Sequence, residues 1–369
     1  MKDIQMFAKR AVGALALTIT ITLGGAVCGA STAKALDINE YVSIDWISEV
    51  IVGTYKDDTG NESDENKPEI RAHGELHVGG KFKTDSGLTV GGEIEFEAAS
   101  DSTNNIDELY VYSSGEFGRL EAGDQDGAAD QLGSDVPSVG FGQVGGFWHS
   151  ENNGFAGQAP IDEIADSSDN TKITYYTPNM EGFKFGISWA PLDDDGETAE
   201  IAAGEETDQF ELGAKYSPPF TTVDLILAAA YFTADDHDEG DQDHSAWDAG
   251  ITLEFDAFAF GVNYVDLGDS GRGVGEDVTG ATLGITYGVG SWGFGASYNT
   301  SEFDAAASQD QDAWSVGTEY IFEPKISGKT PVTMTFAGDF IMFDRSTSNN
   351  GATLGDDGWV AIAYTSLEF

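Results

Sequence analysis

Thiols are almost absent from this 369-residue sequence, which contains one cysteine, Cys28. Cys28 lies in an N-terminal segment that we expect to be removed, as explained below. A mature chain without a thiol forms no disulfide, holds no metal through thiolate and has no cysteine nucleophile. Catalysis or stabilisation through sulfur is therefore not expected of the mature protein.

Basic residues are also scarce: 17 Lys and Arg stand against 65 Asp and Glu, and the formal net charge is −48. A chain of this charge repels nucleic acid and anionic lipid surfaces and attracts cations. We therefore expect no nucleic-acid partner. Soluble and salt-adapted proteins can have acidic surfaces too, so charge alone does not identify the function.

Long apolar runs are missing beyond the N-terminal segment; 225–232 is among the longest. A membrane-spanning helix needs about 20 apolar residues, so helical spans are excluded there. The N-terminal segment has basic residues, an apolar run over 11–27 and the small-x-small sequence Ala-Lys-Ala at 33–35, which are the parts of a secretory signal. We predict a cleaved signal peptide over 1–35 and a mature chain over 36–369. A membrane anchor and a lipid on Cys28 are the less favoured alternatives.

What the mature chain does contain is alternation of apolar and polar residues. In 69–83, Ile70, Leu76 and Phe82 share one face with small residues, while charged side chains dominate the other. Because side chains alternate across a strand, one face of such a strand suits hydrocarbon and the other suits water. Sixteen segments show the pattern: 41–55, 69–83, 88–98, 106–113, 117–123, 171–177, 183–190, 207–217, 221–233, 246–256, 258–266, 278–288, 291–299, 312–322, 331–343 and 358–369.

The connections between these segments alternate in length. The connections 84–87 and 114–116 are short, 56–68 and 191–206 are long, and 124–170 is the longest. Outer-membrane barrels combine short periplasmic turns with long external loops. An even number of strands also puts both ends of the mature chain on the periplasmic side. We therefore predict an all-β fold, a 16-stranded antiparallel transmembrane β-barrel with a long third external loop.

The last predicted strand, 358–369, ends on an aromatic residue, Phe369. An unpaired strand edge is a liability, and a closed barrel removes it by pairing the last strand with the first. We expect that pairing here.

A secreted β-sandwich or lectin is the alternative all-β fold. Its inner faces would be apolar, and its connections would show no regular alternation in length. The predicted inner faces here carry many polar and charged residues, which a dry core does not tolerate but a water-filled lumen does. They include Glu93, Glu95, Glu97, Gln209, Glu211, Lys215, Asp248 and Glu254. Aromatic residues also gather near predicted strand ends, as interfacial girdles require; they include Trp46, Trp189, Phe232, Trp247, Trp292, Tyr298, Trp314, Phe322 and Trp359.

Two stretches that flank the longest connection resemble the general bacterial porin family, particularly the porins of alphaproteobacteria. Residues 110–124 (YVYSSGEFGRLEAGD) are similar to the hairpin before the family's constriction loop, and 172–183 (KITYYTPNMEGF) to the hairpin after it. The terminal Phe369 matches the family's assembly signal, which most outer-membrane barrels share. With the strand spacing, the resemblance covers essentially the whole mature chain.

The resemblance implies a homotrimer of barrels in the outer membrane, each with its third loop, about 124–170, folded into the pore. Outer-membrane lipid and the barrel-assembly machinery would be its other partners. By position, four loop acids would line the constriction: Asp124, Asp126, Asp130 and Asp135. The pore wall would include Arg71, His73, His77, Lys81, Lys83, Glu93, Glu95 and Glu97. Family members often place a basic cluster opposite the loop. Here the wall mixes bases with glutamates, which favours a net acidic pore.

Other chemistry finds little support. His73 and His77 share one face of a strand, and we interpret them as polar lumen wall, so no metal centre is predicted. The acidic stretches 193–196 and 235–243 do not fit the twelve-residue calcium loop. No cofactor is expected, although weak binding of a divalent cation such as Ca²⁺ to acidic loops stays open. Nothing singles out a catalytic set among so many carboxylates, so we do not expect an enzyme.

The sequence thus favours an outer-membrane porin: a water-filled channel through which ions, cations above all, and small hydrophilic solutes diffuse passively. A substrate-selective channel is the alternative within transport. An outer-membrane barrel that acts as an adhesin or an enzyme is the alternative of a different class.

Overall fold

The computed structural model describes residues 36–37, 41–57, 67–98, 106–140, 159–164, 166–192, 206–219, 223–236, 241–304, 307–326, 330–349 and 352–369. The predicted signal peptide, 1–35, and the acidic stretch 193–196 lie outside these residues. The stretch 235–243 and the third loop are described only in part.

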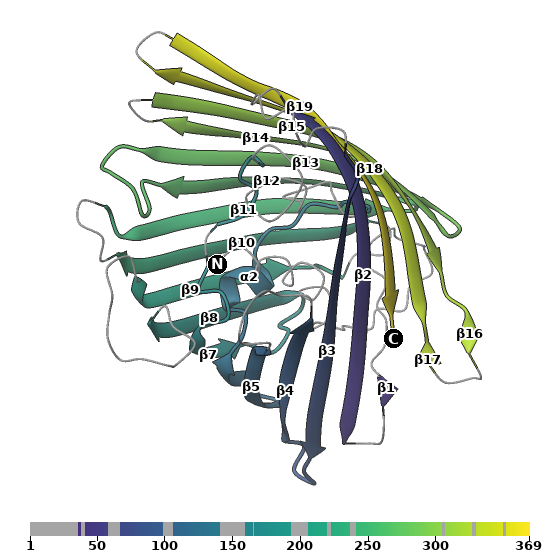
Figure 1. Ribbon diagram of the computed structural model, residues 1–369. Helices are drawn as coiled ribbons and strands as arrows, with labels where there is room; N and C mark the ends of the chain where they lie inside the picture. The colour runs from purple at the N-terminus through teal and green to yellow at the C-terminus, as the bar shows by residue number, and fades with distance from the viewer. Residues whose placement is uncertain are drawn as a thin grey trace.

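Sixteen antiparallel strands form a closed barrel, in which each strand pairs with its neighbours along the chain (Figure 1). β19 pairs with β2, from Glu368 opposite Ile47 to Gly358 opposite Asp57, and so closes the ring as predicted. The bounds are β2 Val42–Asp57, β3 Glu69–Lys83, β4 Thr89–Ala98, β5 Ile106–Gly115, β6 Gly118–Asp124, β7 Thr171–Tyr176, β8 Phe183–Leu192, β9 Glu206–Tyr216, β10 Asp224–Asp236, β11 His244–Phe255, β12 Phe258–Gly268, β13 Asp277–Val289, β14 Trp292–Asp304, β15 Ala307–Phe322, β18 Thr333–Asn349 and β19 Ala352–Glu368.

Four short elements of the described residues are not among the strands of this ring. β1 (Leu36–Asp37) pairs with β2, and β16 (Lys325–Ile326) pairs with β17 (Thr330–Pro331) in the connection between β15 and β18. The helix α2 (Ala128–Leu132) lies in the third loop. Among the described residues, no helix has the length and the apolar character needed to cross a membrane.

The strand count and the inward fold of the third loop are confirmed, but several strands are longer than predicted. β14 continues to Asp304, β15 begins at Ala307, β18 continues to Asn349 and β19 begins at Ala352. The added residues are rich in Asp, Ser, Thr and Asn. Outside the apolar band both faces of a strand meet water, so the alternation that predicts a strand disappears while the backbone pairing continues.

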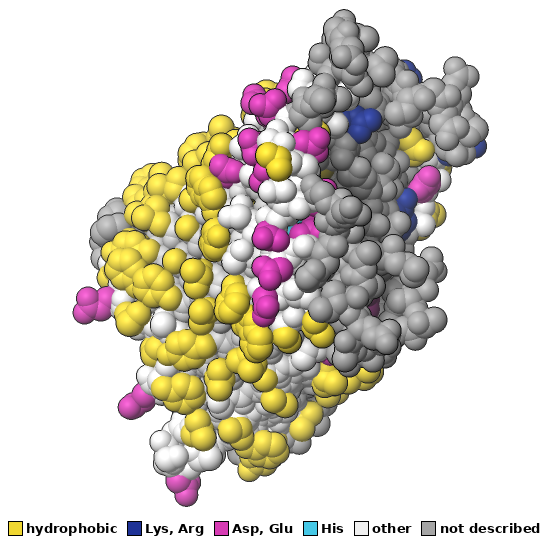
Figure 2. All heavy atoms as spheres, turned by 90° about the vertical axis from the view of Figure 1, so that its left-hand side faces the viewer, with side chains coloured by type: hydrophobic (Ala, Val, Ile, Leu, Met, Phe, Trp, Pro, Cys, Tyr) yellow, Lys and Arg dark blue, Asp and Glu magenta, His cyan; other side chains and the backbone are white. Residues whose placement is uncertain are grey.

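The outer surface of the barrel is apolar. Large side chains such as Ile173, Leu212, Ile285 and Trp314 are exposed there, and Figure 2 shows hydrophobic side chains spread over much of the outer surface. Contiguous exposed apolar area of this extent suits hydrocarbon and not water. The alternation in sequence therefore reports which face of each strand contacts lipid.

Most of the tryptophans predicted for the aromatic girdles face outward. Phe232, which was predicted for the same girdles, does not. Trp46, Trp189, Trp247, Trp292 and Trp314 are exposed, whereas Phe232 is fully buried. The even-numbered residues of β10 face the lumen, where Phe232 packs in a cluster with residues of neighbouring strands and with Ile164 of the third loop. The prediction of Phe232 as a girdle residue was wrong, because an aromatic residue near a strand end can also anchor a loop inside.

The seam between β19 and β2 includes Phe369. Its backbone N–H donates to the carbonyl of Trp46 over 3.1 Å, its carbonyl accepts from the N–H of Trp46 over 2.9 Å, and the two rings are stacked. Deleting Phe369 removes about 2 kcal/mol of backbone hydrogen bonding together with the ring contact. We expect the deletion to lower the unfolding temperature of the barrel, measured by heat-modifiable mobility on gels.

Phe369→Tyr keeps both hydrogen bonds and the aromatic ring and serves as the control. An unchanged unfolding temperature and unchanged yield of the deletion variant would contradict a role for Phe369 in closing the barrel.

Candidate functional site

The third loop enters the barrel and binds its inner wall. The loop leaves β6 at Asp124 and forms α2, which contacts β7, β8, β9 and β10 (Figure 1). The N–H of Ala128, at the start of α2, donates to Ser188 Oγ of β8 over 2.7 Å. The helix is therefore fixed to the wall at its first residue, and the loop narrows the lumen.

Glu211 of β9 binds two parts of this loop, the part that follows β6 and the part that precedes β7. Its Oε2 accepts from the N–H of Ala129 over 2.8 Å, and its Oε1 accepts from the N–H and hydroxyl of Ser167. The side chain is completely buried. Since hydrogen bonds to a charged acceptor are stronger than neutral ones, this carboxylate is a major anchor of the loop.

Contacts farther along the loop continue around the wall. Asp248 of β11 accepts from the N–H of Ser134 over 2.9 Å, and Glu319 of β15 accepts from the N–H of Gly140 over 3.2 Å. On the returning arm, Asn263 of β12 donates to the carbonyl of Asp162, and Asn299 of β14 donates to that of Pro160. Polar wall side chains thus satisfy backbone groups of a buried loop, as buried polar groups require.

Glycines on the inner face of the strands leave room for the loop. A Cβ atom on Gly213 would lie 2.1 Å from the carbonyl oxygen of Ala128, and one on Gly280 would lie 2.2 Å from that of Ile161. A Cβ on Gly250 would lie 2.6 Å from the Cβ of Ser134. The loop therefore lies against the bare backbone of the wall at these positions.

Two of the inner-face acids consequently have another role than the one predicted. The sequence places Glu211 and Asp248 in a water-filled lumen, whereas the structure buries both against the loop. A charged residue predicted to face the lumen can contact water or can bind an inserted segment, and its charge alone does not distinguish the two.

The four predicted loop acids have different environments. Asp124, at the end of β6, accepts a hydrogen bond from the Thr171 hydroxyl. Asp126 is buried, and the Gln131 amide lies 3.3 Å from a carboxylate oxygen of both Asp126 and Asp130. Asp135 is exposed and accepts from the N–H of Val136. Three of them lie on the loop itself, and Asp124 lies where the loop begins.

The predicted wall residues all lie on the inner-facing positions of β3 and β4. Lys81 and Lys83 are exposed at the hairpin end of β3, and Arg71 pairs with Glu69 over 3.1 Å. Between them, His73 and His77 are buried together with glutamates of β2, β3 and β4. The wall is therefore basic at the hairpin end and rich in carboxylate in the middle.

A cavity of about 230 Å³ lies between this wall and the loop. Its acidic lining residues are Asp45, Glu93, Glu108, Glu121 and Asp126, and its Lys and Arg residues are Arg119 and Lys184. The other lining residues are His77, Tyr110, Tyr112, Gln125, Gln131 and Tyr176.

Three bases of this region were missed from the sequence. Arg119 pairs with Glu121 and stacks 3.8 Å from the centre of the Tyr112 ring, while Lys184 lies 4.8 Å from the centre of the Tyr176 ring. Lys172 is buried, and its ammonium group donates to the carbonyls of Gln125 and Ser168. The inner-face parity of their strands was the available signal, whereas the predicted Lys and Arg residues of the wall all lie within 69–83.

A closed barrel with an apolar exterior and its own chain folded into a polar lumen defines the class of pore-forming outer-membrane barrels. A family model described as Gram-negative porin matches residues 14–336. The chain belongs to this family, and the resemblance drawn from 110–124 and 172–183 is confirmed.

Solved porin structures share the fold. A mutant of the Rhodopseudomonas blastica porin matches with a TM-score of 0.56 and 19% identity, covering 89% of this chain and 100% of its own. A triple mutant of the same porin gives the same values. A structure titled "Asymmetric conductivity of engineered proteins" matches with a TM-score of 0.56 and 18% identity over the same shares. Among curated proteins, no relative matches.

Removing the Glu211 carboxylate tests the anchoring of the loop. Each hydrogen bond to a charged acceptor contributes about 1.5–3 kcal/mol. In Glu211→Ala, we expect amide hydrogen exchange at Ala129 and Ser167 to accelerate by about tenfold or more, while the strands keep their protection.

Glu254→Ala is the matched control, because Glu254 lies on the inner face of β11 and has no hydrogen bond to the loop among the described residues. Equal exchange at Ala129 and Ser167 in the wild type and in Glu211→Ala would show that other contacts fix the loop.

Proposed function

We propose that this porin is a passive diffusion channel that prefers cations and also passes small hydrophilic solutes. Its family and fold are those of an outer-membrane channel and not of an enzyme. The observation that carries the cation preference is the lining of the 230 Å³ cavity, where five carboxylates stand against two Lys or Arg residues.

The two bases do not balance this excess. Arg119 is paired with Glu121, so the field of that pair falls off quickly with distance. Lys184 then faces the remaining acids of the wall and the loop, namely Asp45, Glu93, Glu108 and Asp126. A mobile cation is therefore attracted to the cavity, and an anion is repelled.

The magnitude is sufficient for a measurable preference. A monovalent ion about 8 Å from one carboxylate gains ~0.5 kcal/mol even at the dielectric constant of water. Four carboxylates less the opposing ammonium group of Lys184 leave ~1.5 kcal/mol, of which screening removes about half at physiological salt, where the Debye length is about 8 Å. Since cations and anions shift in opposite directions, the preference is about fivefold or more.

We also propose that the channel is a homotrimer in the outer membrane, inserted by the barrel-assembly machinery. The support is the membership of the porin family and the apolar exterior, which needs lipid or other subunits to cover it. Protein extracted in mild detergent should migrate as an oligomer that dissociates on heating. A heat-stable monomer at all detergent concentrations would contradict the trimer.

Reversal potentials in a planar bilayer test the selectivity. In a gradient of dilute KCl, we expect a potential of the sign that K⁺ permeation gives, decreasing as the salt concentration rises. Changing Asp124, Asp126, Asp130 and Asp135 to Asn should reduce the K⁺ to Cl⁻ permeability ratio by about two- to fivefold.

The control pair Asp85→Asn and Glu116→Gln removes acids from exposed turns, away from the loop, and should leave the ratio unchanged. Anion preference in the wild type would overturn the proposal. An unchanged ratio in the four-Asn variant would assign the selectivity to the wall acids.

A further inference from the structure

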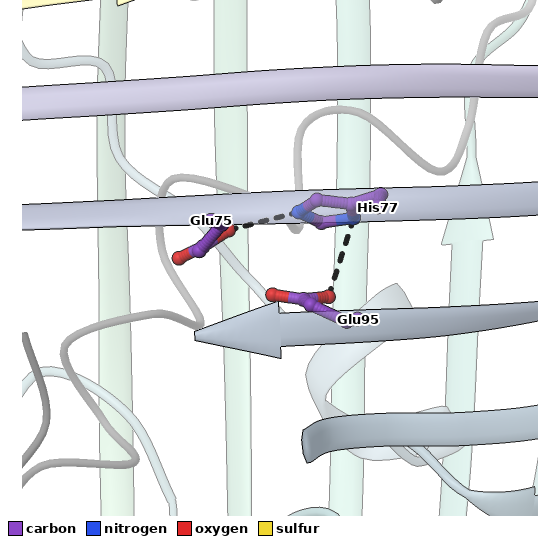
Figure 3. Close-up of side chains that lie close together, drawn as sticks. All are labelled: Glu75, His77 and Glu95. Carbon is purple, nitrogen blue, oxygen red and sulfur yellow. Dashed lines mark hydrogen bonds and ion pairs between the residues drawn. The ribbon is translucent and has the colours of Figure 1, made fainter. Parts of the chain in front are cut away.

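Two glutamates bracket the imidazole of His77 on the inner wall. Glu75 Oε2 lies 2.9 Å from Nε2 of His77, and Glu95 Oε2 lies 3.3 Å from Nδ1. His77 and Glu95 are direct partners across β3 and β4. Figure 3 shows the two carboxylates at different nitrogens of the ring.

These side chains are almost completely shielded from solvent. Glu75 and Glu95 are each 2% exposed and His77 is 3% exposed. The second carboxylate oxygen of Glu95, Oε1, has no hydrogen-bond partner within the described part of the chain. A buried carboxylate oxygen without a partner is costly, and it indicates a position where a cation is stabilised.

The surrounding charges strengthen this conclusion. Five carboxylates contact the two imidazoles of His73 and His77: Glu49, Glu75, Glu93, Glu95 and Glu97. Within the described residues, no Lys or Arg pairs with any of these five. Even two protonated imidazoles leave the carboxylates in excess, so the cluster lacks positive charge.

We propose that Glu75, His77 and Glu95 bind a divalent transition-metal ion such as Zn²⁺. One ligand atom from each lies within 4.8 Å of the other two. Ligands of a tetrahedral Zn²⁺ ion lie roughly 3.4 Å apart, so the carboxylate of Glu95, now beside Nδ1, has to turn toward Nε2 for the three ligands to meet at one ion. Three protein ligands leave the fourth position to water.

The ligand types select the class of ion. Imidazole with carboxylate suits Zn²⁺ and related transition metals, whereas Ca²⁺ and Mg²⁺ prefer oxygen ligands alone. When Nε2 of His77 binds the ion beside Glu75, Nδ1 can donate to the carboxylate of Glu93, which lies 3.6 Å away. Such a carboxylate contact orients a ligating histidine.

The position of the site ties it to the lumen. His77 and Glu93 both line the cavity between the wall and the loop. A bound divalent ion would add positive charge to the wall opposite the loop acids. Occupancy of the site should therefore lower K⁺ conductance.

Zn²⁺ titration of the full-length mature protein, purified in detergent and freed of metal with a chelator, tests the proposal by calorimetry. We expect one saturable site per protomer, which millimolar Ca²⁺ does not displace. His77→Gln and Glu95→Gln should weaken Zn²⁺ binding by at least about tenfold to a hundredfold. Glu254→Gln, which changes another inner-face carboxylate in the same way, should bind as the wild type does.

A second measurement uses the unaltered protein, in case a variant fails to assemble. Zn²⁺, but not Ca²⁺, should shift the imidazole resonances of His77 in NMR spectra of histidine-labelled protein. No saturable Zn²⁺ binding, equal binding in all variants, displacement by Ca²⁺ or absence of this shift would each overturn the site. These measurements do not depend on ion selectivity, so they can fail while the proposed channel function holds.

Discussion

Pairing of backbone N–H and C=O groups is the constraint on which the rest of this structure depends. A hydrocarbon layer offers no partner for these groups, so a sheet can cross it only as a closed ring. The pairing of β19 with β2 closes that ring. Closure then fixes which residues face outward and which face the lumen, because the parity of each strand cannot change without moving its apolar side chains out of the lipid. The apolar exterior and the polar interior both follow from the backbone hydrogen bonding that closes the sheet.

The third loop meets the same constraint inside the lumen. Its backbone groups leave water when the loop binds the wall, and they are satisfied by side chains of six strands or more around the ring. Ser188, Glu211 and Asp248 accept from its N–H groups, while Asn263 and Asn299 donate to its carbonyls. Gly213, Gly250 and Gly280 supply the space. The narrowing of the pore is therefore encoded mainly in the wall strands, far from the loop in sequence.

Features of the fold could be predicted from the sequence where they produce a regular alternation of apolar and polar residues. Each of the sixteen strands has one face toward lipid and one toward the lumen, and that contrast is visible in a single sequence. The ends of β14, β15, β18 and β19 were missed because both faces meet water there. The role of Glu211 was missed because parity assigns a face but not the segment packed on it. Glu93 and Glu95, which lie beside His77, were predicted as wall residues, yet their convergence on its ring depends on the register between β3 and β4, which the sequence pattern alone does not fix.

Some acids of the lumen bind the loop and others line the open cavity, and this difference affects how the acidity of the chain relates to ion selectivity. Glu211, Asp248 and Glu319 each accept hydrogen bonds from the loop backbone, so their charge is partly offset by those N–H groups. Asp45, Glu93, Glu108 and Asp126 line the open cavity instead, without the Arg partner that Glu121 has. Because Coulomb energy falls with distance and with screening, we expect the second group to act more strongly on a passing ion than the first. The net charge of −48 therefore overstates the field in the pore, and the proposed cation preference rests on the local excess of carboxylates in the lining of this cavity.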